Sequence, residues 1–366
     1  MDKFLSRKDT KIIKGIAIVL MLIHHLWGFP YRLYGGELRS ILSIFGYPLT
    51  SVIGLFGRIC VSFFMFLGGY GMYISNSGKS FDLVGKVKSL YVGFWKVFVI
   101  FIPIGFLFFS KQGIYADDPN ICTVFSSFDT RALFMNFVGL ECNYNAEWWF
   151  FASYLFAVIS FPIVRRLIKG KSASINILLV IVGTILIEKP IPTLAYNESL
   201  GVMNDVFLYG RLACFSRFTG SFWMGMVCAN NGLLDRLAEG LKEKKLLNPI
   251  IDVLGWAVMI LLRGQLDDSI DIFIVPLLIV LSMDLLGRCK LLSLLFEKLG
   301  IESENMWLVH SFICYYFGIT ARVVTITRWA VPSLVILIVM SYVTALLITY
   351  FWKGIGKLLV KWIPER

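Results

Sequence analysis

Hydrophobic residues gather along the chain in long runs that short polar segments separate. An α-helix needs about 20 mostly apolar residues to cross a hydrocarbon core of ~30 Å, and ten runs come close to that length. They cover residues 12–28, 57–74, 90–109, 147–167, 173–187, 211–229, 247–262, 270–286, 306–326 and 331–352. The apolar segment 41–56 contains Gly46, Pro48 and Gly54, which favour a re-entrant or interfacial segment. The pattern therefore predicts an all-α membrane bundle of about ten transmembrane helices.

The composition agrees with a membrane protein and argues against a soluble one. Of the 366 residues, 57% are hydrophobic and 16% are charged, whereas soluble domains have roughly 45–50% apolar and about 25% charged residues. A soluble fold of this composition would expose large apolar patches. We find no internal repeat or separate polar domain, so we expect a single membrane domain over residues 1–366. Residues 110–146, the longest outer segment, could form a small cap.

The basic residues predict the orientation of the spans. The net charge of +11 could suggest a nucleic-acid partner, but such a partner needs a solvated basic domain. If the N-terminus lies in the cytoplasm, lysines and arginines on the cytoplasmic side outnumber those outside about three to one, which is the bias of inner-membrane proteins. Both termini are therefore expected in the cytoplasm, and the charge reflects topology in the cell membrane.

The seven cysteines include no C-x-x-C pair, so no metal site is predicted. Cys122 and Cys142 share the outer segment and could form a disulfide in an oxidising compartment. The sequence alone leaves this pairing open, because it depends on geometry.

Two polar residues of the first span lie on one face of the predicted helix. Lys14 and His25 are eleven residues apart, or about 16 Å along a helix and close to three turns. They could mark the two ends of one path through the membrane. The alternative for Lys14 is a lysine at the helix end whose side chain extends to the inner interface. The alternative for His25 is a hydrogen-bonded histidine without a catalytic role. His24 points about 100° away and is expected to pack against or hydrogen-bond to a neighbouring helix.

More charged residues are expected at the depth of His25, in the outer half of the bundle: Arg58, Glu147, Arg211 and Arg217. Charges in a bilayer are costly and often functional. A histidine can accept a hydroxyl proton, and arginines can stabilise an oxyanion, so the set fits acyl transfer. The alternative is a set of buried Arg–Glu pairs that specify helix packing. The small residues of segment 66–71 could allow two helices to pack closely or could allow the narrow arm of a cofactor to pass. Close helix packing is the favoured interpretation.

The spacing of Lys14 and His25 resembles the first-span signature of the acyltransferase-3 family, a basic residue and a histidine with ten residues between them. Three further segments resemble motifs of this family, in order along nearly the whole chain. They are the Phe-Phe segment 58–70, the segment from Glu147 to Pro162, and the segment 299–310 that ends in His310. Three details differ: Lys14 stands where arginine is usual, Gly68 stands where serine is usual, and the basic pair after the second span appears only as Lys86 and Lys88.

The resemblance implies an integral membrane O-acyltransferase that modifies bacterial surface glycans such as exopolysaccharides. The donor would be an acyl-CoA, commonly acetyl-CoA, loaded from the cytoplasm, and the acceptor would be a hydroxyl of an extracytoplasmic or lipid-linked saccharide. Cofactor binding is expected from the inner cations and the late histidine: Lys14, Lys86, Lys88 and His310.

The positions and chemistry of the outer residues suit this route, and we assign their roles as a hypothesis. His25 would act as general base, Arg58 and Arg211 would stabilise charge, and Glu147 would orient a partner. Contacts to the acceptor are expected from Arg32, Arg217 and Trp148.

A transporter or flippase-like module is the main alternative, because intramembrane charges around a central path suit transport as well. A receptor or structural scaffold is a third possibility, but it would leave the charged cluster around His25 without a task. Release of free CoA by the purified protein distinguishes an enzyme from a transporter.

Overall fold

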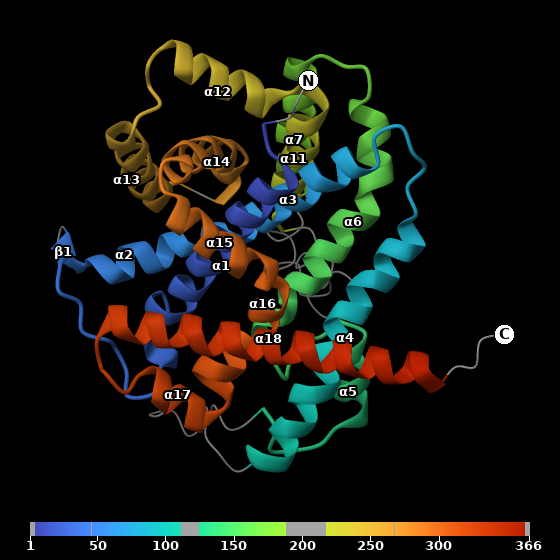
Figure 1. Cartoon of the computed structure of the whole chain (residues 1–366), viewed down its shortest axis with the longest axis vertical. Coiled ribbons are helices and arrows are strands. Elements are labelled where there is room, and N and C mark those ends of the chain that lie inside the picture. Colours follow the sequence, from blue (N-terminus) through green and yellow to red (C-terminus); the bar gives the residue numbers. More distant parts are fainter. Residues whose placement is uncertain (1–3, 45, 111–123, 188–216, 267, 363–366) are drawn as a thin grey trace, which may run out of the picture. The chain divides into compact units, whose positions relative to one another are not determined.

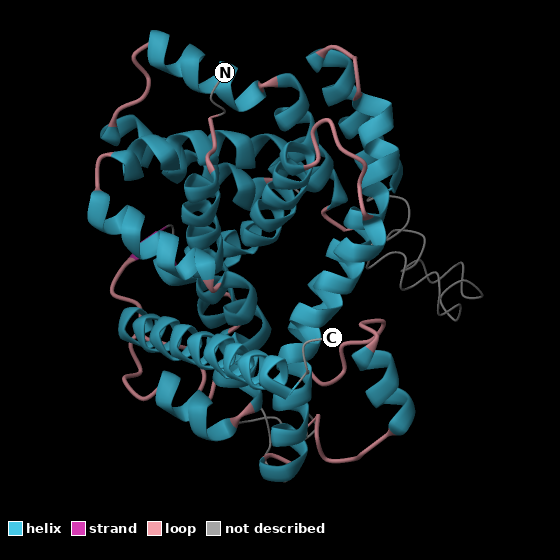
Figure 2. Ribbon diagram, turned by 45° about the vertical axis from the view of Figure 1, so that its right-hand side comes forward, coloured by secondary structure: helices cyan, strands magenta, loops and turns pink. Residues whose placement is uncertain are grey.

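The computed structural model describes residues 4–44, 46–110, 124–187, 217–266 and 268–362. Helices make up 79% of the structure, and Figure 2 shows almost no other regular element. A short antiparallel hairpin, β1 (Ser43–Ile44) with β2 (Tyr47–Pro48), pairs Ser43 with Pro48 and Ile44 with Tyr47. The expected all-α class is confirmed.

The chain divides into two compact units, and neither is one continuous segment. The first consists of Met1–Ala17, Arg58–Val87 and Trp149–Gly300, and the second of Ile18–Gly57, Lys88–Trp148 and Ile301–Arg366. Two long helices, α1 (Arg7–Trp27) and α4 (Leu83–Phe108), are divided between the units, and α15 (Lys290–Ile301) has its last residue in the second unit.

In the first unit, α3 and α11 pack along one another, as Figure 1 shows, and α11 also contacts α6, α7, α12 and α14. Its elements, besides the start of α1 and of α4, are α3 (Cys60–Ser75), α6 (Trp149–Ile168), α7 (Ala173–Ile187), α11 (Thr219–Asn231), α12 (Leu233–Glu243), α13 (Pro249–Gln265), η5 (Asp268–Ile270), α14 (Asp271–Gly287) and α15 (Lys290–Ile301).

In the second unit, α18 packs against α16, and the short π-helix η6 packs against both α17 and α18. Its elements, besides the hairpin and the later parts of α1 and α4, are η1 (Pro30–Arg32), α2 (Leu49–Phe56), α5 (Thr130–Phe137), η3 (Ala146–Trp148), α16 (Ser303–Ser311), η6 (Phe312–Tyr316), α17 (Gly318–Val324) and α18 (Ala330–Trp362). The short η2 (Gly57–Ile59) follows α2 at the division between the units.

Several helices begin at capping residues that the sequence supplies. At the start of α1, the Ser6 backbone N–H donates to the Asp9 carboxylate and the Asp9 N–H donates to the Ser6 hydroxyl, at 2.9 and 3.2 Å. This reciprocal pair satisfies two N–H groups that a helix leaves unpaired. Asn248 caps α13 in a similar way, with Pro249 at the first helical position. These local signals fix where the apolar runs become helical.

One face of α18 shows how the helices meet their surroundings. Val331, Val335, Val339, Val343 and Leu347 recur every fourth residue and are each about half exposed. In water such a continuous apolar stripe would be a liability, but lipid solvates it. The stripe indicates a lipid-facing surface.

Among the described residues, six helical stretches are long and apolar enough to cross a membrane. They are Arg7–Trp27, Leu49–Ser75, Leu83–Phe108, Ala146–Ile168, Asp268–Gly287 and Ala330–Leu358. A seventh crossing is possible if the pair Ser303–Tyr316 and Gly318–Val324, bent by 92°, forms one span. The expected count of about ten is therefore not confirmed, and the predicted continuous span 306–326 is bent.

The remaining predicted spans correspond to shorter helices. α7 has 15 residues, α13 has 17 and α11 has 13; residues 211–216, where the sixth predicted span begins, lie outside the described part. The segment 41–56, predicted to be re-entrant or interfacial, forms the hairpin and then α2, which joins the apolar stretch Leu49–Ser75.

Candidate active site

Two histidines, one half-buried and one buried, meet in the second unit. The rings of His25 on α1 and His310 on α16 have centroids 4.7 Å apart. The Nδ1 of His310 lies 2.7 Å from the Trp307 carbonyl oxygen. Because a carbonyl can only accept, this Nδ1 carries the proton, and Nε2 holds the lone pair.

Neither histidine uses its full hydrogen-bonding capacity. Within the described part of the chain, the buried Nδ1 of His25 and the buried Nε2 of His310 have no hydrogen-bond partner. Buried polar atoms of this kind are rare and call for an explanation. Two neighbouring imidazoles with open nitrogens are suited to accept and pass on a proton.

Glu147 forms the centre of the adjoining polar network. Its Oε1 lies 2.6 Å from a guanidinium nitrogen of Arg32, and its Oε2 accepts a hydrogen bond of 3.0 Å from the Tyr316 hydroxyl. The Arg32 guanidinium lies 3.9 Å from the Tyr315 ring centroid, and the Tyr315 hydroxyl donates to the His25 backbone carbonyl. The ion pair is thus connected to the backbone of the helix that carries His25.

Asn145 links the segment before Glu147 to the helix of His310. Its Oδ1 accepts from the Ser311 hydroxyl at 2.9 Å and from the Glu147 backbone N–H at 3.2 Å. These two donors fix the orientation of the amide, so its Nδ2 is a donor. In the described structure this Nδ2 is buried and has no partner.

The π-helix η6 explains how two consecutive tyrosines serve this network. The Phe317 N–H donates to the Phe312 carbonyl, an i→i−5 bond of 2.8 Å. The wider turn changes the direction of the side chains that follow His310, and such π-turns often occur at functional sites. Tyr315 and Tyr316 consequently reach His25 and Glu147.

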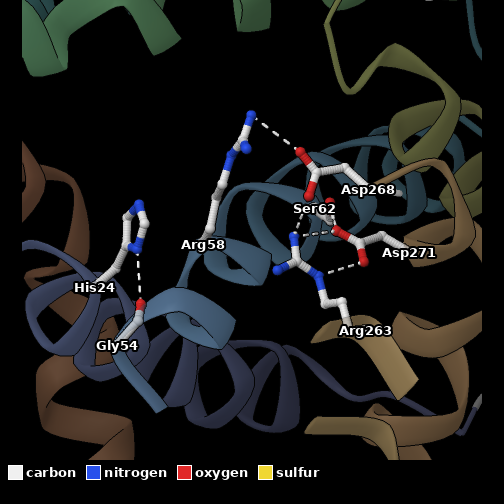
Figure 3. Close-up of polar contacts among 7 residues, drawn as sticks. All are labelled: His24, Gly54, Arg58, Ser62, Arg263, Asp268 and Asp271. Carbon is white, nitrogen blue, oxygen red and sulfur yellow. Dashed lines mark hydrogen bonds and ion pairs between the residues drawn. The ribbon is translucent and has the colours of Figure 1, made fainter. Parts of the chain in front are cut away.

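His24 is occupied by a structural contact. Its Nδ1 donates to the Gly54 carbonyl of α2 at 2.8 Å (Figure 3). The expectation that His24 bonds to a neighbouring helix is confirmed.

A second charged cluster lies in the first unit. Arg263 pairs with both oxygens of Asp271 at 2.7 and 3.1 Å and with Asp268 at 2.8 Å (Figure 3). The same Asp268 pairs with Arg58 at 3.0 Å, and Ser62 donates to Asp271 at 2.7 Å. Arg58 is therefore paired with a carboxylate.

The structure brings some of the predicted residues together and assigns others to the first unit. His25, His310, Glu147 and Arg32 converge in the second unit. Trp148 is also there, but it is 3% exposed and its indole N–H donates to the Leu308 carbonyl, within an aromatic core. Its predicted contact with the acceptor stays a prediction.

The other predicted residues belong to several places. Arg58 and Arg217 lie in the first unit, and Arg211 lies outside the described residues. Lys14 on α1 and Lys86 on α4 belong to the first unit, and Lys88 belongs to the second. Their expected roles in charge stabilisation and donor binding stay predictions.

Sequence reasoning missed the neutral members of the network: Asn145, Ser311, Tyr315 and Tyr316. The only signals for them were the short distances along the chain from Asn145 to Glu147 and from Ser311 to His310. In the part of the chain that the structure describes, no group of three or more His, Cys, Asp or Glu side chains could hold a metal ion.

Comparison with known proteins gives one match. The model of the acyltransferase-3 family, described as an acyltransferase domain, matches residues 9–353. No curated protein and no solved structure matches the chain.

Proposed function

Because the chain belongs to the acyltransferase-3 family, whose domain model covers nearly all of it, we propose that this membrane acyltransferase uses an acyl-CoA donor. The expected donor is acetyl-CoA, and the expected acceptor is a hydroxyl group of an extracytoplasmic or lipid-linked saccharide. The location would be the cytoplasmic membrane, where a donor from inside can meet an acceptor outside.

The observation that carries the proposal is the pair His25 and His310, each with a buried nitrogen that has no partner within the described residues. In the proposed step the acceptor oxygen attacks the thioester carbonyl carbon, a C–O bond forms and the C–S bond breaks. The hydroxyl proton passes to the Nδ1 of His25 and then to the departing CoA sulfur. General base catalysis of this kind contributes roughly 10²–10⁴-fold to a rate.

His310 is proposed to act next to His25 on the donor side. Its tautomer leaves Nε2 as an acceptor, so it can share the proton that His25 takes up. Glu147 is proposed to orient Arg32, and the Tyr315 hydroxyl fixes the backbone of His25. Lys14, Lys86 and Lys88 are proposed to bind the phosphates of CoA at the cytoplasmic side, as compact charges rather than bidentate forks.

The test is release of free thiol from acetyl-CoA by the purified, full-length protein, with and without a surface-glycan extract. We expect release by the wild type, raised by the extract, and a loss of at least about 100-fold in His25→Ala and in His310→Gln. His24→Asn is the matched control: an asparagine amide can still donate to the Gly54 carbonyl, so this variant should stay active.

Two results would contradict the proposal. Full activity of His25→Ala would remove this histidine from the reaction. No thiol release under any condition, together with no binding of CoA, would favour a transporter or flippase-like module.

A further inference from the structure

Arg58 and Arg217, both in the first unit, lie near the same aromatic ring. The ring centroid of Phe218 lies 5.6 Å from the Arg58 guanidinium carbon and 5.7 Å from that of Arg217. Arg217 also lies 5.8 Å from the ring centroid of Trp149, whose ring is 5.9 Å from that of Phe218. Two cations and two aromatic rings therefore form one continuous group, here called the arginine–aromatic group.

Arg217 differs from Arg58 and Arg263 in its contacts within the described residues. Asp268 and Asp271 are shared among Arg58 and Arg263, and Arg263 alone contacts both carboxylates. For Arg217, the contacts within the described residues are with the rings of Trp149 and Phe218 and include no carboxylate. A cation in a membrane protein normally pairs with an anion or faces a functional path.

The backbone holds Phe218 in an unfavourable conformation for a bulky residue. Its φ is 64° and its ψ is 9°, at the residue that precedes α11. A bulky side chain at positive φ is an outlier, and such outliers persist where the surrounding structure enforces them, often at ligand sites. This conformation holds the buried Phe218 ring near both guanidinium groups.

The guanidinium groups retain donors for a ligand. A guanidinium carries five N–H donors that match the oxygens of a carboxylate or phosphate. Arg58 uses one nitrogen on Asp268, and its side chain is 37% exposed. Arg217 and Trp149 are half-buried. A ligand with an oxyanion beside a sugar ring could therefore contact the guanidinium groups and stack on the Trp149 indole.

From this group we infer that the protein selects an acidic acceptor, a saccharide that carries a carboxylate or a phosphate. The arginine–aromatic group binds that oxyanion. The inference rests on the proposed transfer to a saccharide, and it adds the charge of the substrate. Neutral saccharides without such a group bind more weakly.

The test measures binding to the full-length protein in a neutral detergent, without any acyl donor, so that a failure of the transferase proposal would not change it. The probes are trigalacturonic acid, its methyl ester, and a prenyl diphosphate. We expect at least one acidic probe to bind. If the anion is a carboxylate, the methyl ester should bind at least about tenfold more weakly than the acid. Arg217→Gln should weaken the binding of the acidic probe by about tenfold or more.

The three probes distinguish the source of the anion. Preference for trigalacturonic acid assigns a sugar carboxylate, and preference for the diphosphate assigns a lipid-linked phosphate. Two results would overturn the inference. In the first, the acid and its ester bind equally and the diphosphate does not bind. In the second, wild type and Arg217→Gln have equal affinities for the acidic probe.

Arg39→Gln is the matched control, because Arg39 also lies 5.8 Å from a tryptophan ring, that of Trp329, and its loss should leave binding unchanged. If Arg217→Gln does not fold, Arg217→Lys replaces it. Lysine keeps the charge but loses the bidentate fork, so acidic binding should weaken without being lost, and unchanged affinity would again overturn the inference.

Discussion

At the scale of single residues, the pair of Glu147 and Arg32 connects the parts of the candidate active site. Their side chains are 4% and 12% exposed, so both charges are largely removed from water. Desolvation makes such a pair a weak source of net stability, but removal of one partner leaves the other charge buried without compensation. We therefore expect the stability of the protein to fall more when one partner is removed than when both partners are replaced together.

Glu147→Gln should destabilise the protein by about 3–5 kcal/mol, because the Arg32 cation loses its counter-charge. Glu147→Gln combined with Arg32→Met should recover part of this loss. The measurement is the unfolding midpoint of each purified variant in detergent. Glu297→Gln is the control, since its partner Lys8 is 64% exposed and exposed pairs contribute about 1 kcal/mol or less. Equal midpoints of Glu147→Gln and wild type would refute this account of the pair.

The residues that the sequence made visible were those whose charge is unusual in an apolar run. His25, His310 and Glu147 stand out for this reason, and the structure brings them into one unit. Their partners were not predictable, because Tyr315 and Tyr316 look like ordinary aromatic residues of a span. Their roles depend on the π-turn at η6, and this turn is set by packing rather than by a local signal. Arg58 likewise pairs with Asp268, a residue far away along the chain.

At the scale of helices, glycines determine how closely α3 and α11 approach. A Cβ at Gly69 would overlap the Phe222 carbonyl oxygen, and one at Gly225 would overlap the Phe66 carbonyl oxygen. Small residues allow this backbone contact between apolar helices, which have no hydrophobic driving force in lipid. The predicted packing role of segment 66–71 is thus confirmed for Gly69.

Gly69→Ala should lower stability by about 1–3 kcal/mol or more, because the helices must separate to admit the methyl group. Gly71→Ala is the matched control on the same helix, since no atom lies within 4 Å of a Cβ at that position. Size-exclusion profiles after heating would report the difference in detergent. A Gly69→Ala variant as heat-resistant as Gly71→Ala would show that the contact is not tight.

Hydrophobic periodicity predicted the positions of the helices along the chain better than their bends. α1, α4, α7 and α18 lie where the apolar runs placed them. The 92° bend after Tyr316 was not predicted, because no proline marks it within the apolar run 306–326. The bend follows from the π-turn and from Phe317, whose extended backbone breaks the helix before Gly318.

At the scale of the whole molecule, the number of crossings depends on three short helices. A helix of 15 residues, such as α7, is about 22 Å long, less than a hydrocarbon core of ~30 Å. By length alone, six or seven crossings are present among the described residues. If the bent pair crosses and α7, α11 and α13 cross as well, the total becomes ten. Sequence could not resolve this difference, because a short apolar run may cross a thinned bilayer or lie buried in protein.

The connection between α14 and α15 distinguishes the two counts. If α7, α11 and α13 all cross, this connection lies on the side of the N-terminus; if none crosses, α14 is the fifth crossing and the connection lies on the opposite side. Arg288, Lys290 and Lys298 sit in and after this connection, and the positive-inside bias favours the cytoplasm. The basic residues therefore support the count of ten.

Cys289, in the same connection and half-buried, provides the measurement. In a variant that keeps only this cysteine, a membrane-impermeant maleimide should label inside-out vesicles and leave intact cells unlabelled. Ile41→Cys in a cysteine-free chain is the control, because Ile41 is 81% exposed and follows the first crossing, so it should be labelled in intact cells under either count. Labelling of Cys289 in intact cells would instead mean that none or two of the three short helices cross. Both termini could then share the cytoplasm only if the bent pair Ser303–Tyr316 and Gly318–Val324 does not cross.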